Sequence, residues 1–112
     1  MAKYECKVNG NFDELIEIID NRILKGSMSA SFEDGSEYVG NNVRCVVRVY
    51  ERYSMLGKNR VSLNVTLVED GDTIFVSGVT SGGSQAVLFK LNTFGEETFL
   101  DCFIDAVNSY GR

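Results

Sequence analysis

Residues 43–68 read VRCVVRVYERYSMLGKNRVSLNVTLV, and their pattern decides the fold expected for this chain. In both halves apolar, β-branched and aromatic residues recur at every second position, a period that is typical of β-strands and not of helices. Between the halves, the Gly and Asn of residues 56–59 (LGKN) suit a turn. The sequence therefore predicts a long two-stranded antiparallel ribbon with one covered face.

The two faces of the predicted ribbon differ in chemistry. The face expected to be covered holds the apolar residues of both strands: Val43, Cys45, Val47, Val49, Tyr53, Met55, Val61, Leu63, Val65 and Leu67. The face expected to meet solvent carries Arg44, Arg48 and Arg52, spaced by about 13 Å along an extended strand, with Val46 and Tyr50 between them. A register slip of one residue would exchange the faces, so we expect the pairing to be well specified.

The rest of the chain supplies further strands and two helices. A helix is predicted over 12–25, because apolar residues follow a 3.6-residue period between a cap at Asn11 and a stop at Gly26. A second is predicted over about 95–110, opened by a capping box of Thr93 and Glu96. Strands are expected over 2–8, 27–39 (with a turn or bulge at 34–35), 73–80 and 85–91, and Asp70-Gly71 predicts a hairpin turn.

These elements define an α+β fold in a single domain, residues 1–112. We expect one curved antiparallel sheet of five or six strands with two helices, in the order β-α-β(4–5)-α, and the second helix lying across the sheet. This plan resembles the helix-grip (START/Bet v 1-like) fold in miniature, and the TATA-binding-protein-like β-α-β4-α plan fits almost as well. Such analogies concern the fold and leave the function open.

Composition narrows the protein class. The chain has 112 residues, of which 44% are hydrophobic and 24% charged, which is typical of a soluble globular protein. No apolar run is long enough for a membrane span, and the N-terminal residues do not form a signal peptide. Cys6, Cys45 and Cys102 are odd in number and far apart, which predicts a reduced, cytoplasmic protein. The net charge of −5 argues against a nucleic-acid partner.

The residue types also exclude several chemistries. Without histidine, the common Ser-His-Asp and Cys-His catalytic systems are impossible. We predict no catalytic residue, no metal site and no cofactor. Gly82, Gly83 and Ser84 either form a hairpin loop, the interpretation we favour, or hold an anion with their backbone amides.

The basic face of the ribbon is the candidate site. Residues 43–60 hold five basic residues and one acidic one, a net charge of +4 within an acidic chain. The predicted ligand- or partner-binding residues are Arg44, Arg48, Tyr50, Arg52 and Arg60, since arginine side chains recognise carboxylates and phosphates. The alternative, which we favour, is a solvated face whose arginines pair with acids on neighbouring strands, such as Glu33 and Glu37.

Four stretches carry a family resemblance: SFEDGS at 31–36, RVYERYSMLG at 48–57, SGGSQ at 81–85 and NTFGEE at 92–97. By these the chain resembles, almost end to end, an uncharacterised domain-of-unknown-function family of small cytoplasmic proteins from Gram-positive, Clostridium-like bacteria. The resemblance implies a stand-alone bacterial domain and transfers no mechanism.

Three functions compete. The leading hypothesis is a non-enzymatic binding or protein-interaction module that associates with itself, with an acidic protein or with an anionic ligand. The second is a carrier of small apolar ligands, with Phe99, Phe103 and Val107 lining a cavity under the last helix; the alternative for these residues is a packed core. The third is a small enzyme that acts on an anionic substrate, with Tyr50 or Tyr53 as the acid.

Overall fold

A computed structural model describes residues 1–26, 29–54, 59–82 and 89–110 of the chain. In these ranges it contains five strands and two helices, in the expected order β-α-β4-α. Their bounds are β1 Ala2–Asn9, α1 Phe12–Gly26, β2 Ser31–Val39, β3 Val43–Ser54, β4 Asn59–Asp70, β5 Thr73–Gly82 and α2 Phe89–Tyr110. The predicted α+β class, with one antiparallel sheet and two helices, is confirmed.

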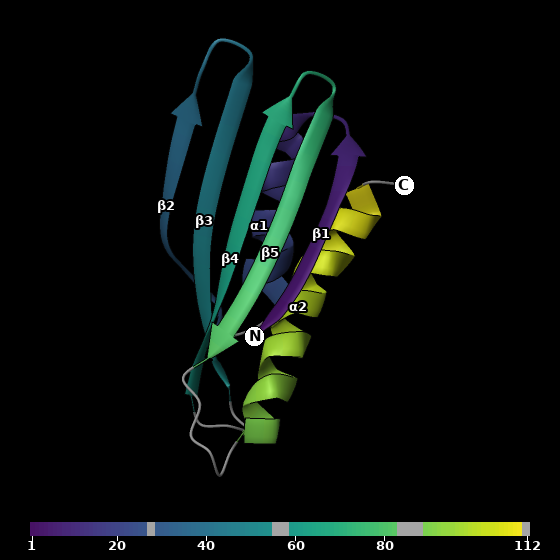
Figure 1. Cartoon of the computed structure of the whole chain (residues 1–112). Coiled ribbons are helices and arrows are strands. Elements are labelled where there is room, and N and C mark those ends of the chain that lie inside the picture. The colour runs from purple at the N-terminus through teal and green to yellow at the C-terminus, as the bar shows by residue number, and fades with distance from the viewer. Residues whose placement is uncertain (27–28, 55–58, 83–88, 111–112) are drawn as a thin grey trace.

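The five strands form one sheet in the order β1-β5-β4-β3-β2, and every neighbouring pair is antiparallel. Both helices lie on the same face of this sheet, so the molecule has two layers (Figure 1). Helix α2 packs against β5, β4 and β1, and also against α1. Strand β2 and the upper part of β3 extend beyond the helices (Figure 1), and nearly every residue of β2 is exposed.

Three local predictions, the cap at Asn11, the irregularity near Asp34 and the turn at Asp70-Gly71, are confirmed. The side chain of Asn11 caps α1, because its Oδ1 accepts a hydrogen bond of 2.9 Å from the backbone N–H of Glu14. Gly71 has a φ of 64° in the β4–β5 turn, a conformation in which glycine has no Cβ to clash. The predicted irregularity near Asp34 is a β-bulge between Phe32 and Asp34, where the register of β2 against β3 shifts.

The core lies between the sheet and the helices. It combines the apolar stripe of α1, the odd-numbered residues of β4 and the buried side of α2. The fully buried aliphatic and aromatic members include Leu15, Ile19, Ile23, Val61, Leu63, Val65, Leu67, Val76, Phe99 and Phe103. Each such side chain contributes about 1.5–3 kcal/mol when it is removed from water, so this layer supplies most of the driving force for folding.

Two predictions near the C-terminus are wrong: the strand at 89–91 and the start of the second helix at its capping box. The strand expected over 85–91 is not formed at 89–91, because α2 already begins at Phe89; residues 83–88 lie outside the described ranges. Consequently Thr93 and Glu96 lie inside the helix and not at its start. A short apolar run such as 87–91 fits a strand and a helix equally well by periodicity, and its length cannot decide between them.

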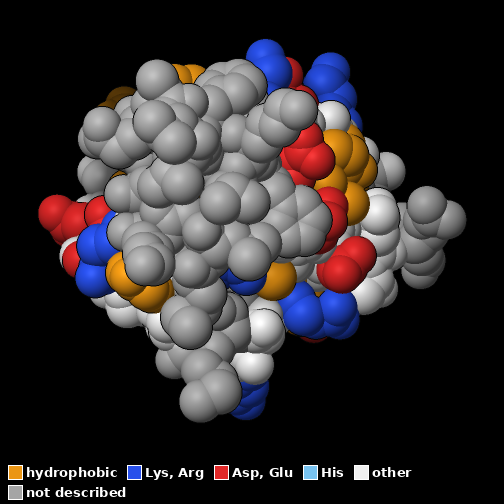
Figure 2. Space-filling view, turned by 90° about the horizontal axis from the view of Figure 1, so that it is seen from below, with side chains coloured by type: hydrophobic (Ala, Val, Ile, Leu, Met, Phe, Trp, Pro, Cys, Tyr) orange, Lys and Arg blue, Asp and Glu red, His pale blue; other side chains and the backbone are white. Residues whose placement is uncertain are grey.

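Figure 2 views the molecule from the lower end of Figure 1 and shows acidic, basic and hydrophobic side chains side by side around that end. Among the helices of the described ranges, neither is long and apolar enough to cross a membrane.

Candidate functional site

Pairing with β4 determines which side of β3 faces the helices. Val46, Arg48, Tyr50 and Arg52 pair with Leu67, Val65, Leu63 and Val61 respectively, and those four residues of β4 are fully buried. Residues that are directly opposite on neighbouring strands project to the same face of a sheet. The even-numbered residues of β3 therefore face the helices, and the prediction that they meet solvent is wrong.

Tyr50 is the largest buried side chain that β3 contributes, and it forms a polar cluster with Asp20 of α1 and Arg48. Its hydroxyl donates a hydrogen bond of 2.7 Å to Asp20 Oδ1 and accepts one of 3.0 Å from Arg48 Nε. Arg48 Nη2 donates a further bond of 2.8 Å to the same Asp20 oxygen. The Arg48 guanidinium also lies 4.3 Å from the ring centre of Phe32, within cation–π range.

The environment of Tyr50 decides what its hydroxyl can do. Burial, together with the hydrogen bond to the Asp20 carboxylate, raises the pKa of Tyr50 well above the ordinary value of a tyrosine. The hydroxyl therefore stays protonated at neutral pH and serves as a donor between helix and sheet. A fully buried phenol of raised pKa is a poor general acid, which argues against the hypothesis of an enzyme that uses Tyr50.

Arg44 is held by two acids. Its Nη2 lies 2.8 Å from Asp13 Oδ1, and its Nε donates a bond of 2.6 Å to Glu37 Oε2. These hydrogen bonds raise the pKa of Arg44, and the bond to Arg44 lowers the pKa of Asp13. The predicted pairing of an arginine with Glu37 is thus found, but it extends to an acid of α1 as well.

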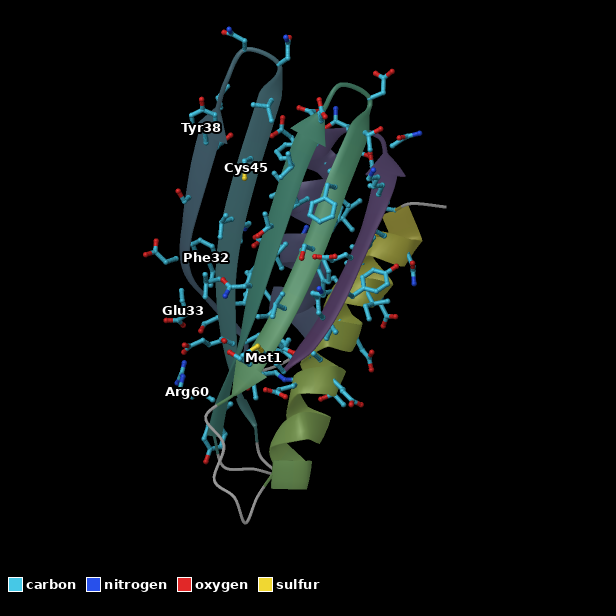
Figure 3. All side chains as sticks on the ribbon, in the orientation of Figure 1. Met1, Phe32, Glu33, Tyr38, Cys45 and Arg60 are labelled. Atoms are coloured by element: carbon cyan, nitrogen blue, oxygen red, sulfur yellow. The ribbon has the colours of Figure 1, made fainter. Side chains whose placement is uncertain are left out.

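Arg52 and Arg60 complete the predicted set on opposite faces. Arg52 Nη2 donates a bond of 2.6 Å to Thr98 Oγ1 on α2, and its guanidinium lies 4.8 Å from the ring centre of Phe99. Arg60 lies on the outer face, the side of the sheet away from the helices. There its Nε donates a bond of 2.8 Å to Glu51 Oε1, and its Nη2 lies 3.8 Å from Glu33 Oε2. Figure 3 labels Arg60 and Glu33.

The predicted basic surface is therefore divided. Three of its arginines join β3 to the two helices through acids, a threonine and aromatic rings, while Arg60 alone stays outside. An arginine can cover apolar surface with its aliphatic stem and keep its guanidinium at the rim, which explains how three of them line the border of the helix layer. Of the predicted anion loop, Gly82 is the last residue of β5, and Gly83 and Ser84 lie outside the described ranges.

The outer face of the sheet is the feature that the sequence prediction missed. Its middle carries apolar side chains that neither α1 nor α2 covers and that are only partly buried: Cys45, Val47 and Val49 of β3, Val68 of β4, and Phe75 and Val79 of β5. Toward β2 it continues into Tyr38, which pairs with Cys45 and is 65% exposed (Figure 3). An antiparallel sheet with one solvated face normally presents polar residues there, so this apolar stripe calls for a functional explanation.

The side of the sheet under the helices is filled. Phe99, Phe103 and Val107 are buried, and the Phe103 ring lies against the backbone of Gly78, where a Cβ atom would come within 2.5 Å of the ring. This packing favours the core interpretation of these residues over the ligand cavity that the carrier hypothesis requires.

Metal chemistry gains no support from the arrangement of potential ligands. Within ranges 1–26, 29–54, 59–82 and 89–110, no three Cys, Asp or Glu side chains come close enough together to hold a metal ion. Cys6, Cys45 and Cys102 are free thiols, each partly buried.

Fold and surface together define a class: a two-layer α+β domain with a filled core and an uncovered, partly apolar sheet face. The chain belongs to the family of unknown function DUF6054, whose sequence profile matches residues 1–111. Comparison with curated proteins and with solved structures gives no match for this chain.

Proposed function

We propose that this protein is a non-enzymatic interaction module that self-associates through the outer face of its sheet. The observation that carries the proposal is the apolar stripe around Val47, Val49, Phe75 and Val79, which both helices leave uncovered. Burying such a stripe against another protein surface gains about 25 cal/mol for each Å² of apolar area removed from water.

The remaining features agree with an interaction role. The arginines that were candidates for ligand binding already have partners inside the fold, so they leave little capacity to recognise an external anion. The proposal of a cytoplasmic protein from Gram-positive bacteria rests on the three free thiols and on the family resemblance of the sequence.

The proposal is tested by the oligomeric state of purified protein, measured by native mass spectrometry and by sedimentation velocity over a concentration series. We expect the wild type to form a dimer or a higher species of bare protein, and Val47→Glu to shift it to monomer. The matched control is Val39→Glu. Val39 is 66% exposed, but it pairs with Arg44 and therefore lies on the other side of the sheet, so its substitution should leave the association unchanged.

A wild-type protein that stays monomeric at high concentration would refute the proposal. So would equal behaviour of the two glutamate variants. A monomer that carries extra mass, released on denaturation, would instead support the carrier.

A further inference from the structure

The outer face is organised in rows that run across all five strands. One row consists of Lys3, Val79, Asn64, Val49 and Asp34, in the order β1-β5-β4-β3-β2. Four residues further along the strands, a parallel row consists of Lys7, Phe75, Val68, Cys45 and Tyr38. In both rows a lysine occupies the β1 edge, apolar residues occupy β5 and β3, and β4 is the middle strand.

This arrangement is complementary to itself under one particular rotation. A two-fold axis parallel to the strands and lying over β4 exchanges β1 with β2 and β5 with β3. It brings Lys3 of one copy opposite Asp34 of the other, and Val79 opposite Val49. In the second row it brings Lys7 opposite Tyr38, whose ring or hydroxyl can receive a lysine ammonium group.

The other two-fold axis that lies in the plane of the interface is perpendicular to the strands, and it gives a poorer match. It places each strand over its own copy, so that Lys3 of one chain meets Lys7 of the other and like charges lie opposite each other. Edge-to-edge pairing of two β2 strands is also unfavourable, because Glu33, Asp34 and Glu37 of both copies would crowd together without a basic residue on that strand.

On this basis, and resting on the proposed function above, we propose that the partner on the outer face is a second copy of this chain. The two sheets pack face to face in an aligned sandwich about a two-fold axis over β4, with Lys3 of each copy paired to Asp34 of the other. Five strands about 4.8 Å apart and eight residues long cover about 500 Å² in projection. Side-chain relief enlarges that figure toward the roughly 800 Å² per partner of a standard interface.

The exposure of the paired residues suits this contact. The Lys3 side chain is 62% exposed, and its ammonium group lies 3.9 Å from Glu5, at the outer limit of an ion pair. Asp34 is exposed on the edge strand and accepts a hydrogen bond from the backbone N–H of Gly35. Both charges are therefore available at the two rims, where they determine orientation more than affinity.

The test exchanges the charges at positions 3 and 34 and measures the dissociation constant of the dimer by sedimentation velocity at low salt. Lys3→Glu and Asp34→Lys each create two symmetric like-charge contacts and should weaken the dimer about tenfold. The double variant restores opposite charges and should return the dissociation constant to within about threefold of the wild type. Lys7→Glu makes the same charge change on the same strand, but opposite Tyr38, and should weaken the dimer much less than Lys3→Glu.

Asp34→Lys also removes the acceptor of the hydrogen bond from the Gly35 N–H, so a second, more conservative variant is measured as a control. Asp34→Asn keeps an acceptor oxygen and removes only the charge. It should weaken the dimer less than Asp34→Lys while the far-ultraviolet circular dichroism spectrum stays that of the wild type.

The outcomes separate the two proposals. If Val47→Glu dissociates the oligomer but the double charge variant shows no recovery, the outer face is the interface and the two-fold arrangement is wrong. Filaments, or a continuous series of oligomers of increasing size, would also refute the closed two-fold dimer. If the wild type never associates, the proposed function and the arrangement fail together.

Discussion

Gly78→Ala is the substitution that most directly tests how the core is packed. In β5 the glycine lies under α2, and a Cβ atom built on it would be 2.5 Å from Phe103 Cε2 and 2.6 Å from Cδ2. Carbon atoms in contact stay about 3.5–4.0 Å apart, so the ring would have to move by about 1 Å. Because Phe103 is fully buried and its neighbours are packed, such a movement strains the core.

We expect this overpacking to lower the free energy of unfolding by about 1–3 kcal/mol. For a domain of this size that corresponds to a fall in Tm of about 4–12 °C. Urea denaturation followed by circular dichroism measures the change directly. The control is Gly82→Ala in the same strand, where the nearest atom to the new Cβ is Val61 Cγ2 at 3.5 Å, an ordinary contact, so its effect should be small.

A second substitution shows whether the ring is the cause. Phe103→Leu removes ring atoms, so the cost of Gly78→Ala should shrink when both changes are combined, a coupling that a double-mutant cycle measures. If Gly78→Ala leaves stability unchanged or raises it, there is free space beside Phe103. The region under α2 would then have room for a ligand, contrary to the packed core inferred for Phe103.

Two further predictions concern the cluster of Asp20, Arg48 and Tyr50. Asp20→Asn removes the charge that binds both Arg48 and Tyr50, and we expect it to cost about 1–3 kcal/mol of stability in urea denaturation. The control is Asp13→Asn, the same change seven residues earlier on α1, which affects the more exposed ion pair with Arg44 and should cost less stability. Equal losses of stability in the two variants would contradict a special role for the cluster. Tyr50→Phe removes a hydroxyl whose pKa is raised by burial and by the hydrogen bond to Asp20. The stability that this hydroxyl contributes is therefore complete below the pKa of 10.0 that tyrosine has in the unfolded chain, and it is lost as the pH rises above that value. The stability gap between wild type and Tyr50→Phe should therefore narrow by about 1.4 kcal/mol between pH 8 and pH 11, and a gap that stays constant over this range would rule out the raised pKa.

Much of the fold follows from the sequence alone. The cap at Asn11, the stop at Gly26 and the apolar stripe between them define α1, because these signals act within one or two helical turns. The strict alternation of Val61, Leu63, Val65 and Leu67 determines which side of β4 is buried, since the other side is polar except at Val68. The turn at Asp70-Gly71 depends on local backbone conformation in the same way.

The orientation of β3 depended on the tertiary structure. Both of its sides carry apolar residues, so alternation alone favoured the side with Cys45, Val47 and Val49. The helix layer ends near β3, and at that border the side facing the helices can be lined by arginines whose stems are buried and whose heads reach acids. The spacing of acidic residues along α1 and of arginines along β3 could have indicated that these side chains pair. Asp13 and Asp20 lie about 10.5 Å apart along a helix, close to the roughly 13 Å between Arg44 and Arg48 along a strand.

The start of α2 and the apolar outer face likewise depended on tertiary structure. The run at 87–91 fits two periods, so local sequence does not choose between strand and helix. The pairing of β3 with β4 shows that Val47 and Val49 lie on the outer face and not in the core, where the sequence pattern had placed them. Sequence periodicity shows that a strand has two faces, but only the placement of the helices decides which of them is buried.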